Sequence, residues 1–186
     1  MRRAHDRSRP AAAGDRSGVP SGPVRRGGGD EYRTEAAMNA LVVPDRRPCR
    51  AESELWRLPP DGTAARLLRS RVSGQLCDWC LSELGPDLAL IASELAGNAV
   101  RYGHPPYWAN LHMLTDPGRP ESVRLIVADV GPGFDVADVV DSWRLSGTMD
   151  RGRGRGLLLV DALADSWGTA ARAPFCLTWA DLATPR

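Results

Sequence analysis

The stretch 93-SELAGNAVRYG-103 decides the fold predicted for this chain of 186 residues. Before and within it, apolar side chains recur at the spacing of one helix face, at Leu88, Ile91, Leu95 and Ala99. Glu94, Asn98 and Arg101 follow one another at intervals of four and three residues, so they share a neighbouring face of the same helix. The stretch therefore predicts a helix over 86–102 that carries polar groups beside its buried stripe.

These polar groups could simply be solvated on a surface helix, and the stretch alone leaves that alternative open. The side-chain oxygen of an asparagine is, however, a hard and neutral ligand, which can complete a Mg²⁺ shell made mostly of phosphate and water oxygens. A glutamate one turn earlier can accept a proton from an attacking hydroxyl, or hold that hydroxyl in line. Asn98 is therefore a candidate metal ligand, and Glu94 is a candidate catalytic base.

A second stretch, 127-VADVGPGF-134, reads as the end of a buried strand that runs into a turn. Asp129 stands where the strand ends, and Gly131 and Gly133 follow it. A carboxylate in this place can accept a hydrogen bond from an exocyclic amine such as that of adenine, while the glycines let a flat ring approach. An aspartate that only caps the turn is the alternative.

A third stretch, 151-RGRGRGLLLV-160, places alternating glycines and arginines directly before a predicted helix over 156–165. Glycines allow backbone N–H groups to face an anion, and the helix N-terminus adds its dipole. The spacing is not that of a dinucleotide-binding fingerprint, and the lysine of a Walker A loop is absent, so a flexible loop is the alternative. The candidate phosphate-binding residues are Gly152, Gly154 and Gly156, and Arg151, Arg153 and Arg155 add positive charge that would suit phosphates.

Composition narrows the class of protein. All 24 of the lysine and arginine residues are arginine, which excludes chemistry that needs a lysine. The net charge of +1 provides no overall field for nucleic acid or membrane. No apolar run is long enough for a membrane span, and no signal peptide is visible, so we expect a cytoplasmic protein.

Residues 1–50 differ from the rest of the chain. They hold 11 arginines and six acidic residues, are rich in Gly, Pro and Ser, and show no apolar period. We predict a disordered tail over 1–50, with a basic tail that binds nucleic acid as the alternative. Met38 is an alternative start site, in which case residues 1–37 would be absent from the native protein.

The remaining residues, 51–186, are predicted to form one domain. Its expected elements are strands over 54–59, 107–114, 122–130, 166–170 and 175–181, helices over 62–84, 86–102 and 156–165, and a short helical piece near 136–143. This order predicts an α+β fold, a two-layer α/β sandwich with a mixed, mostly antiparallel sheet covered on one face by helices.

Cys77 and Cys80 have the C-x-x-C spacing of redox and metal sites, but we expect two half-buried helix cysteines.

Taken together, the three stretches resemble the motifs of the GHKL ATPases, whose ATP site is the Bergerat fold. ELAGNAVRYG (94–103) is similar to the N box of that family, DVGPGF (129–134) to its first glycine box, and GRGRGLLLV (152–160) to its second. Within the superfamily, the chain looks most like the short anti-sigma-factor serine/threonine kinases related to RsbW and SpoIIAB, which are abundant in actinomycetes. The likeness covers about 52–181.

The resemblance implies a role for each matching residue. It implies that Asn98 binds the Mg²⁺ that bridges the triphosphate of ATP, and that Glu94 is the catalytic base or an orienting carboxylate. Asp129 would bind the adenine amino group, with Gly131 and Gly133 shaping that part of the site. The backbone amides of the second glycine box would hold phosphates, and the segment between Phe134 and Arg153 would be the ATP lid. The predicted nucleotide-binding set is completed by Arg101, Gly152, Gly154, Arg155, Gly156 and Leu157.

Two positions differ from close relatives. Tyr102 stands where the N box usually has a histidine, and Pro174 and Phe175 stand where the closing hairpin usually carries a Gly-Lys pair.

The expected function is phosphorylation of an anti-anti-sigma (STAS-type) partner. The protein is expected to form a homodimer and to bind a sigma factor as well, with no direct nucleic-acid contact. A nucleotide-binding module that controls a partner without phosphorylating it is the alternative. The catalytic part of a sensor histidine kinase is disfavoured, because no helical segment precedes residue 52.

Overall fold

The computed structural model of the protein describes residues 48–185, except 116, 119–120 and 146–154. The side chains of 142–145 and of Arg155 also lie outside the description. Residues 1–47 of the predicted tail are outside it, so the prediction of disorder is untested. Strand β1 (Cys49–Glu52) begins two residues before the predicted start of the domain.

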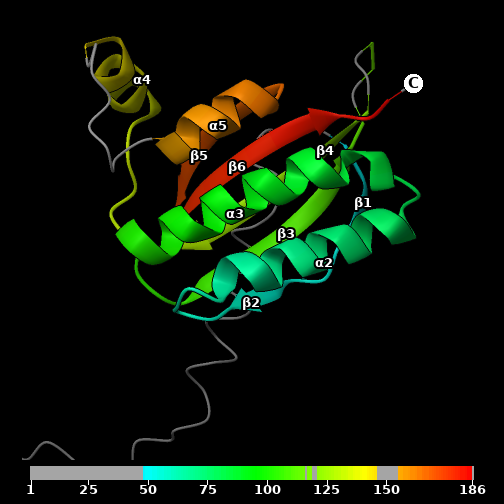
Figure 1. Ribbon diagram of the computed structural model, residues 1–186, viewed down its shortest axis with the longest axis horizontal. Coiled ribbons are helices and arrows are strands. Elements are labelled where there is room, and N and C mark those ends of the chain that lie inside the picture. The colour runs from blue at the N-terminus through cyan, green and yellow to red at the C-terminus, as the bar shows by residue number, and fades with distance from the viewer. Residues whose placement is uncertain (1–47, 116, 119–120, 146–154, 186) are drawn as a thin grey trace, which may run out of the picture.

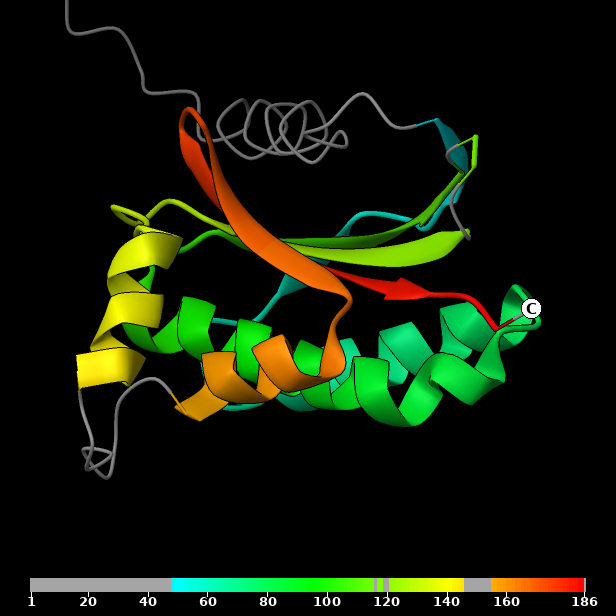
Figure 2. The same ribbon diagram turned by 90° about the horizontal axis from the view of Figure 1, so that it is seen from above.

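The described chain forms a six-stranded sheet with helices against one face (Figures 1 and 2). After β1 come β2 (Trp56–Leu58), α2 (Ala64–Asp78), the 3₁₀ turn η1 (Ser82–Leu84), α3 (Gly85–Tyr102), β3 (Tyr107–Leu114), β4 (Ser122–Asp129), α4 (Val136–Leu145), α5 (Arg155–Leu163), β5 (Ser166–Arg172) and β6 (Phe175–Ala183). The strand order is β1-β3-β4-β6-β5, with β2 also beside β3, and every described pair is antiparallel. The predicted α+β sandwich is confirmed.

The two faces of the sheet carry different side chains because residues alternate along each strand. Toward the helices, the core holds Ala109, Leu111, Val123, Leu125, Val127, Ala180 and Leu182. The opposite face holds a second apolar cluster of Trp108, Ile126, Ala128, Phe175 and Leu177. Asp129 follows Val127 by two positions, so the end of β4 directs this carboxylate toward the helix layer.

Helix α3 lies across the middle of the helix layer, between α2 and α5 (Figure 1). The predicted stripe of Leu88, Ile91, Leu95 and Ala99 is buried, as the apolar period requires. Gly103 ends the helix, and its backbone N–H donates a hydrogen bond to the Ala99 carbonyl at 2.9 Å. The sequence therefore predicted this helix correctly, within one residue at its start.

The first predicted helix, over 62–84, is too long at its C-terminal end, because α2 ends at Asp78 and a separate 3₁₀ turn, η1, follows. The Leu81 N–H donates to the Leu76 carbonyl at 2.8 Å, and the Cys80 N–H donates to the Cys77 carbonyl at 3.0 Å. This is the Schellman arrangement, and it requires the left-handed backbone that Cys80 adopts at φ 59°. The prediction of two half-buried helix cysteines is also wrong, because Cys77 lies in α2 but is exposed, and Cys80 lies beyond the end of the helix and is exposed as well.

The predicted lid segment contains α4, which lies at the same end of the molecule as the C-terminal end of α3 (Figures 1 and 2). The rest of that segment, 146–152, lies outside the described residues. Among the helices that are described, none combines the length and the apolar character needed to cross a membrane.

Candidate functional site

A cavity of about 380 Å³ lies between the C-terminal half of α3, the end of β4 and the first turn of α5. Four of the residues predicted for the nucleotide site line it, namely Asn98, Asp129, Gly133 and Leu157. The other lining residues are Leu95, Ala99, Tyr102, Gly103, Val127, Phe134, Val139 and Thr178. The wall is thus largely apolar, with a few polar groups at defined positions, as is usual for a small-molecule site.

Asn98 reaches the cavity from the polar side of α3. Its amide nitrogen Nδ2 is buried and has no hydrogen-bond partner among the described residues. An unsatisfied buried polar group costs about 1–3 kcal/mol, so a ligand that supplied a partner would recover part of that free energy. Because an amide can be turned by 180° within the same outline, the side chain can offer an oxygen or a nitrogen at this point.

Asp129 is held at the end of β4 by contacts that only glycines permit. The Gly131 backbone N–H donates a hydrogen bond to Oδ1 of Asp129 at 2.6 Å. A Cβ on Gly131 would lie 2.8 Å from the Cα of Gly103, and a Cβ on Gly103 would overlap the Asp129 carboxylate. The Val130 N–H also donates to the His104 carbonyl at 2.9 Å. The end of α3 and the turn after β4 therefore pack directly against each other.

The surroundings of Asp129 disfavour its charged form. Burial raises the pKa of this carboxyl group, while hydrogen bonds from the backbone of Gly131 and His104, and the charge of His104, act in the opposite direction. The pKa values of Tyr107 and Cys176 are also raised, first by burial and then by the negative charge of Asp129. A half-buried acceptor with a perturbed pKa on the wall of a cavity is typical of a functional site.

The raised pKa of Asp129 makes a prediction for stability. The folded protein holds this proton more tightly than the unfolded chain, so stability falls as the pH rises from about 3.9, the ordinary Asp value, through the raised pKa. Asp129→Asn cannot ionise, and its Oδ1 can still accept from Gly131. We expect the variant to be more stable than the parent above that pH window and to lose this advantage below it. Thermal melts of both proteins across the acid range would reveal it; an equal difference at every pH would contradict the assignment.

Glu94 does not line the described cavity but lies next to it. A Cβ on Gly156, in the first turn of α5, would overlap Oε2 of Glu94. The carboxylate of α3 therefore contacts the backbone at the start of α5, where a negative charge is favoured by the helix dipole. Two motifs that lie about sixty residues apart in the sequence thus meet in space, and only a glycine at 156 allows it.

Of the other predicted site residues, Gly133 lines the cavity, Arg101 lies outside it, and the rest lie wholly or in part outside the described residues. Gly133 has φ +71°, and a Cβ there would lie 3.0 Å from Sγ of Cys176. Arg101 is exposed and does not line the cavity; its guanidinium lies 5.9 Å from the ring centroid of Tyr102. Gly152 and Gly154 lie outside the described residues, as does the side chain of Arg155. Their predicted roles therefore remain predictions.

Sequence reasoning missed several residues of the cavity wall. Thr178 comes from β6, where it pairs with Val127 and shares its helix-facing side. Strict alternation along 175–181 could have indicated which face of the sheet the Thr178 side chain points to, but not that Thr178 lies opposite β4. Phe134 and Val139 flank the start of the predicted lid, and Phe134 is 39% exposed despite its size. A further cavity of about 460 Å³ shares Asp129, Gly133, Phe134 and Thr178 with the first.

Comparison with known proteins agrees with this arrangement. No curated protein matches the chain in sequence. The family described as "Histidine kinase-like ATPase domain" matches residues 58–173, which is more than half of the chain and includes every described residue of the cavity except those of β6. With the sandwich fold and the cavity beside α3 and β4, this match shows that the chain belongs to the histidine kinase-like ATPase domain family.

Proposed function

We propose that this domain binds ATP with Mg²⁺ in the cavity between α3, β4 and α5, and that it acts as an anti-sigma-factor-like serine/threonine kinase. The proposal of nucleotide binding rests on one observation: Asp129 and Asn98 both lie on the largely apolar wall of the same cavity. Asp129 is a half-buried acceptor, and the side-chain nitrogen Nδ2 of Asn98 is buried without a partner among the described residues. An ATPase-type family supports the same ligand.

In this proposal the base of ATP lies at the Asp129 end of the cavity. The carboxylate accepts a hydrogen bond from the adenine amino group, and the close packing at Gly131 and Gly103 keeps it in place. Apolar lining such as Leu95 and Val127 contacts the ring and keeps water away from that hydrogen bond. Burial strengthens a hydrogen bond to a charged group, so Asp129 is the main determinant of base recognition.

The triphosphate would lie toward Asn98 and the first turn of α5. Asn98 fits a Mg²⁺ ligand, because its buried amide can offer an oxygen to the cavity, and the phosphates would supply further oxygens. When bound, Mg²⁺ would neutralise charge on the phosphates. Backbone N–H groups of Gly156 and Leu157, with the dipole of α5, would hold the phosphate oxygens.

Phosphoryl transfer in this proposal depends on Glu94. As the serine or threonine oxygen of the partner bonds to the γ-phosphorus and the bond to the β–γ bridging oxygen breaks, the carboxylate of Glu94 accepts the hydroxyl proton, and ADP leaves. The contact between Glu94 and Gly156 places this carboxylate beside the proposed phosphate-binding turn. Most of the remaining rate enhancement would come from positioning.

The nucleotide part is tested by calorimetry with ATP and Mg²⁺. We expect the parent protein to bind ATP and Asp129→Asn to bind it about 10- to 100-fold more weakly, because a hydrogen bond to a half-buried charged acceptor is lost. The exposed Asp138 in α4 does not line the cavity, and Asp138→Asn is the matched control, which should bind as the parent does. Equal affinity in Asp129→Asn and the parent would exclude the proposed orientation of the base.

The kinase part is tested separately with γ-labelled ATP and a purified STAS-type anti-anti-sigma protein. Transfer of the label to a serine or threonine of that protein supports a kinase. ATP binding without any transfer supports the alternative, a nucleotide-loaded module that holds a sigma factor or its antagonist. Homodimer formation, which the resemblance also suggests, would be measured by light scattering of the purified protein.

A further inference from the structure

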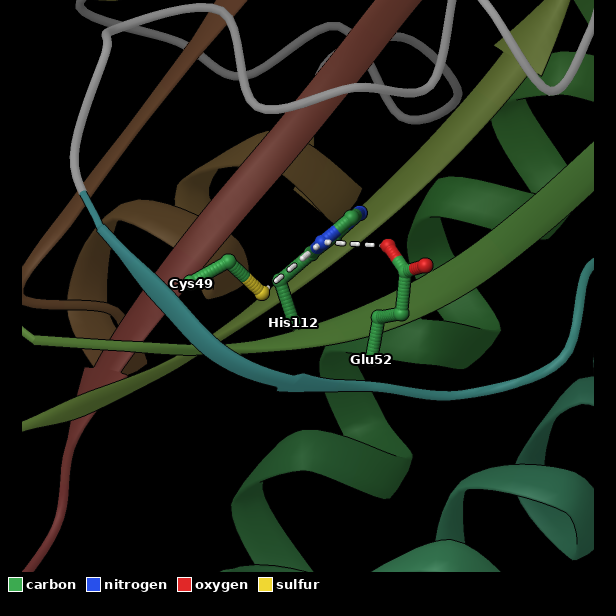
Figure 3. Close-up of side chains that lie close together, drawn as sticks. All are labelled: Cys49, Glu52 and His112. Carbon is green, nitrogen blue, oxygen red and sulfur yellow. Dashed lines mark hydrogen bonds and ion pairs between the residues drawn. The ribbon is translucent and has the colours of Figure 1, made fainter.

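A second group of chemically capable side chains lies on the other side of the sheet from the cavity, at the edge formed by β1 and β3. Cys49, Glu52 and His112 each direct one potential ligand atom to a common point (Figure 3). Sγ of Cys49 lies 3.6 Å from Nδ1 of His112, and Oε2 of Glu52 lies 3.8 Å from the same nitrogen. All three ligand atoms lie within 4.8 Å of one another.

A strand irregularity creates this group. In a regular strand, positions 49 and 52 would point to opposite faces, because their separation is an odd number of residues. The register of β1 against β3 shifts between Cys49 and Ala51, so Cys49 is opposite Leu114 and Glu52 is opposite His112. One extra residue in β1 therefore turns both side chains to the face that carries His112, as a β-bulge does when it redirects a side chain.

The separation between the sulfur of Cys49 and the Nδ1 nitrogen of His112 fits a tetrahedral zinc ion. With Zn–S of about 2.3 Å and Zn–N of about 2.0–2.1 Å, tetrahedral angles separate the sulfur and the nitrogen by about 3.5 Å. The observed separation between Cys49 and His112 is 3.6 Å. A thiolate, an imidazole and a carboxylate are also the ligand types of zinc, whereas Mg²⁺ prefers oxygen ligands only.

Asn110 supports the imidazole of His112 from behind. Its side-chain amide lies 2.8 Å from Nε2 of His112, and both side chains are buried. With the amide turned so that its oxygen accepts the Nε2 proton, Nδ1 carries the lone pair that points toward Cys49 and Glu52. Such a partner for the second ring nitrogen is usual behind metal-bound histidines, where it sets the tautomer and the ring orientation.

The alternative for these residues is a set of local contacts without a metal. The Cys49 thiol donates a hydrogen bond to the Ala51 carbonyl at 3.1 Å, and Glu52 forms an ion pair with His112 only when that ring is protonated. The Glu52 side chain is 70% exposed, so such a pair would contribute little to stability. These contacts engage the groups separately, Cys49 with the Ala51 carbonyl and Glu52 with His112, whereas one cation would bind all three ligand atoms at one point.

We propose that Cys49, Glu52 and His112 bind Zn²⁺, with Asn110 as a positioning residue and one coordination position left for water or a ligand from another molecule. Two of the three ligands come from β1, which precedes the family match that begins at residue 58. The site is therefore an addition to the nucleotide-binding domain. The ion joins the edge strand β1 to β3.

The experiment uses the full chain and Co²⁺ as a spectroscopic probe for Zn²⁺. We expect one equivalent of Co²⁺ to produce the thiolate-to-cobalt absorption band and the intense visible bands of a tetrahedral site, and Zn²⁺ to displace it. Cys49→Ser should lose the thiolate band. Cys77→Ser, which removes an exposed cysteine of α2, is the matched control and should keep it.

Two further variants separate metal binding from folding. Glu52→Gln changes an exposed side chain, so it should fold as the parent does and bind Zn²⁺ more weakly in a chelator competition. Asn110→Ala should weaken Zn²⁺ binding by about 10- to 100-fold while the thiolate band remains, as expected of a residue that orients a ligand. Absence of a thiolate band in the parent, or equal Zn²⁺ affinity in Glu52→Gln and the parent, would overturn the proposal.

Discussion

Glu94→Gln is expected to lower the rate of phosphoryl transfer to the partner protein by about 10²–10⁴-fold, the usual contribution of a general base. Gln has nearly the same shape, so it can keep the contact with Gly156. It cannot accept a proton from the attacking hydroxyl. ATP affinity should change little, because Glu94 does not line the described cavity. Initial rates with γ-labelled ATP, together with calorimetry on the same preparation, would measure both quantities.

Glu83→Gln is the matched control for this prediction. Glu83 is an exposed glutamate of η1 that makes no contact with the cavity, and its removal should leave the transfer rate unchanged. If Glu94→Gln transferred phosphate at the parental rate, Glu94 would not be the base, although the ATP site could still be correct. If its ATP affinity fell together with the rate, Glu94 would act in binding rather than in proton transfer.

The largest effect on stability is expected for Asp181→Ala. Asp181 on β6 and Arg124 on β4 form a two-point ion pair, with Nε to Oδ1 at 2.5 Å and Nη2 to Oδ2 at 2.7 Å. Their side chains are only 4% and 1% exposed. Removing the carboxylate would break a buried ion pair by taking away only one of its partners, which costs about 3–5 kcal/mol of unfolding free energy. Urea unfolding of the parent and the variant would measure this difference.

Asp78→Ala is a suitable control, because Asp78 is exposed at the end of α2 and its removal should change stability by no more than about 0.5 kcal/mol. Replacing both partners, as in Arg124→Met with Asp181→Leu, should recover much of the lost stability, since no buried charge remains. If Asp181→Ala unfolded at nearly the same urea concentration as the parent, the pair would be accessible to water in solution.

Local patterns account for what could be predicted from the sequence. Helix α3 follows from an apolar period of 3.6, and strands β3 and β4 follow from short segments rich in apolar residues; both signals depend only on neighbours in the chain. Where a local signal is ambiguous, the prediction failed. The apolar period continues past Asp78, but the hydrogen bonds of Leu81 and Cys80 end α2 there, and nothing in the sequence marks a cysteine as left-handed.

By itself, the sequence predicted the order of the main helices and strands from β2 onward and the fold class, and it singled out Glu94, Asn98 and Asp129 as candidates, because these follow from spacing within one helix or strand; it did not predict β1. Only the tertiary structure decided which of them meet. It placed Gly156 against Glu94, Gly103 against Asp129 and Thr178 opposite Val127. It also turned Cys49 and Glu52 toward His112 through a shift of strand register. Contacts between distant segments depend on how helices and strands pack, and that packing is a property of the whole chain rather than of any short stretch.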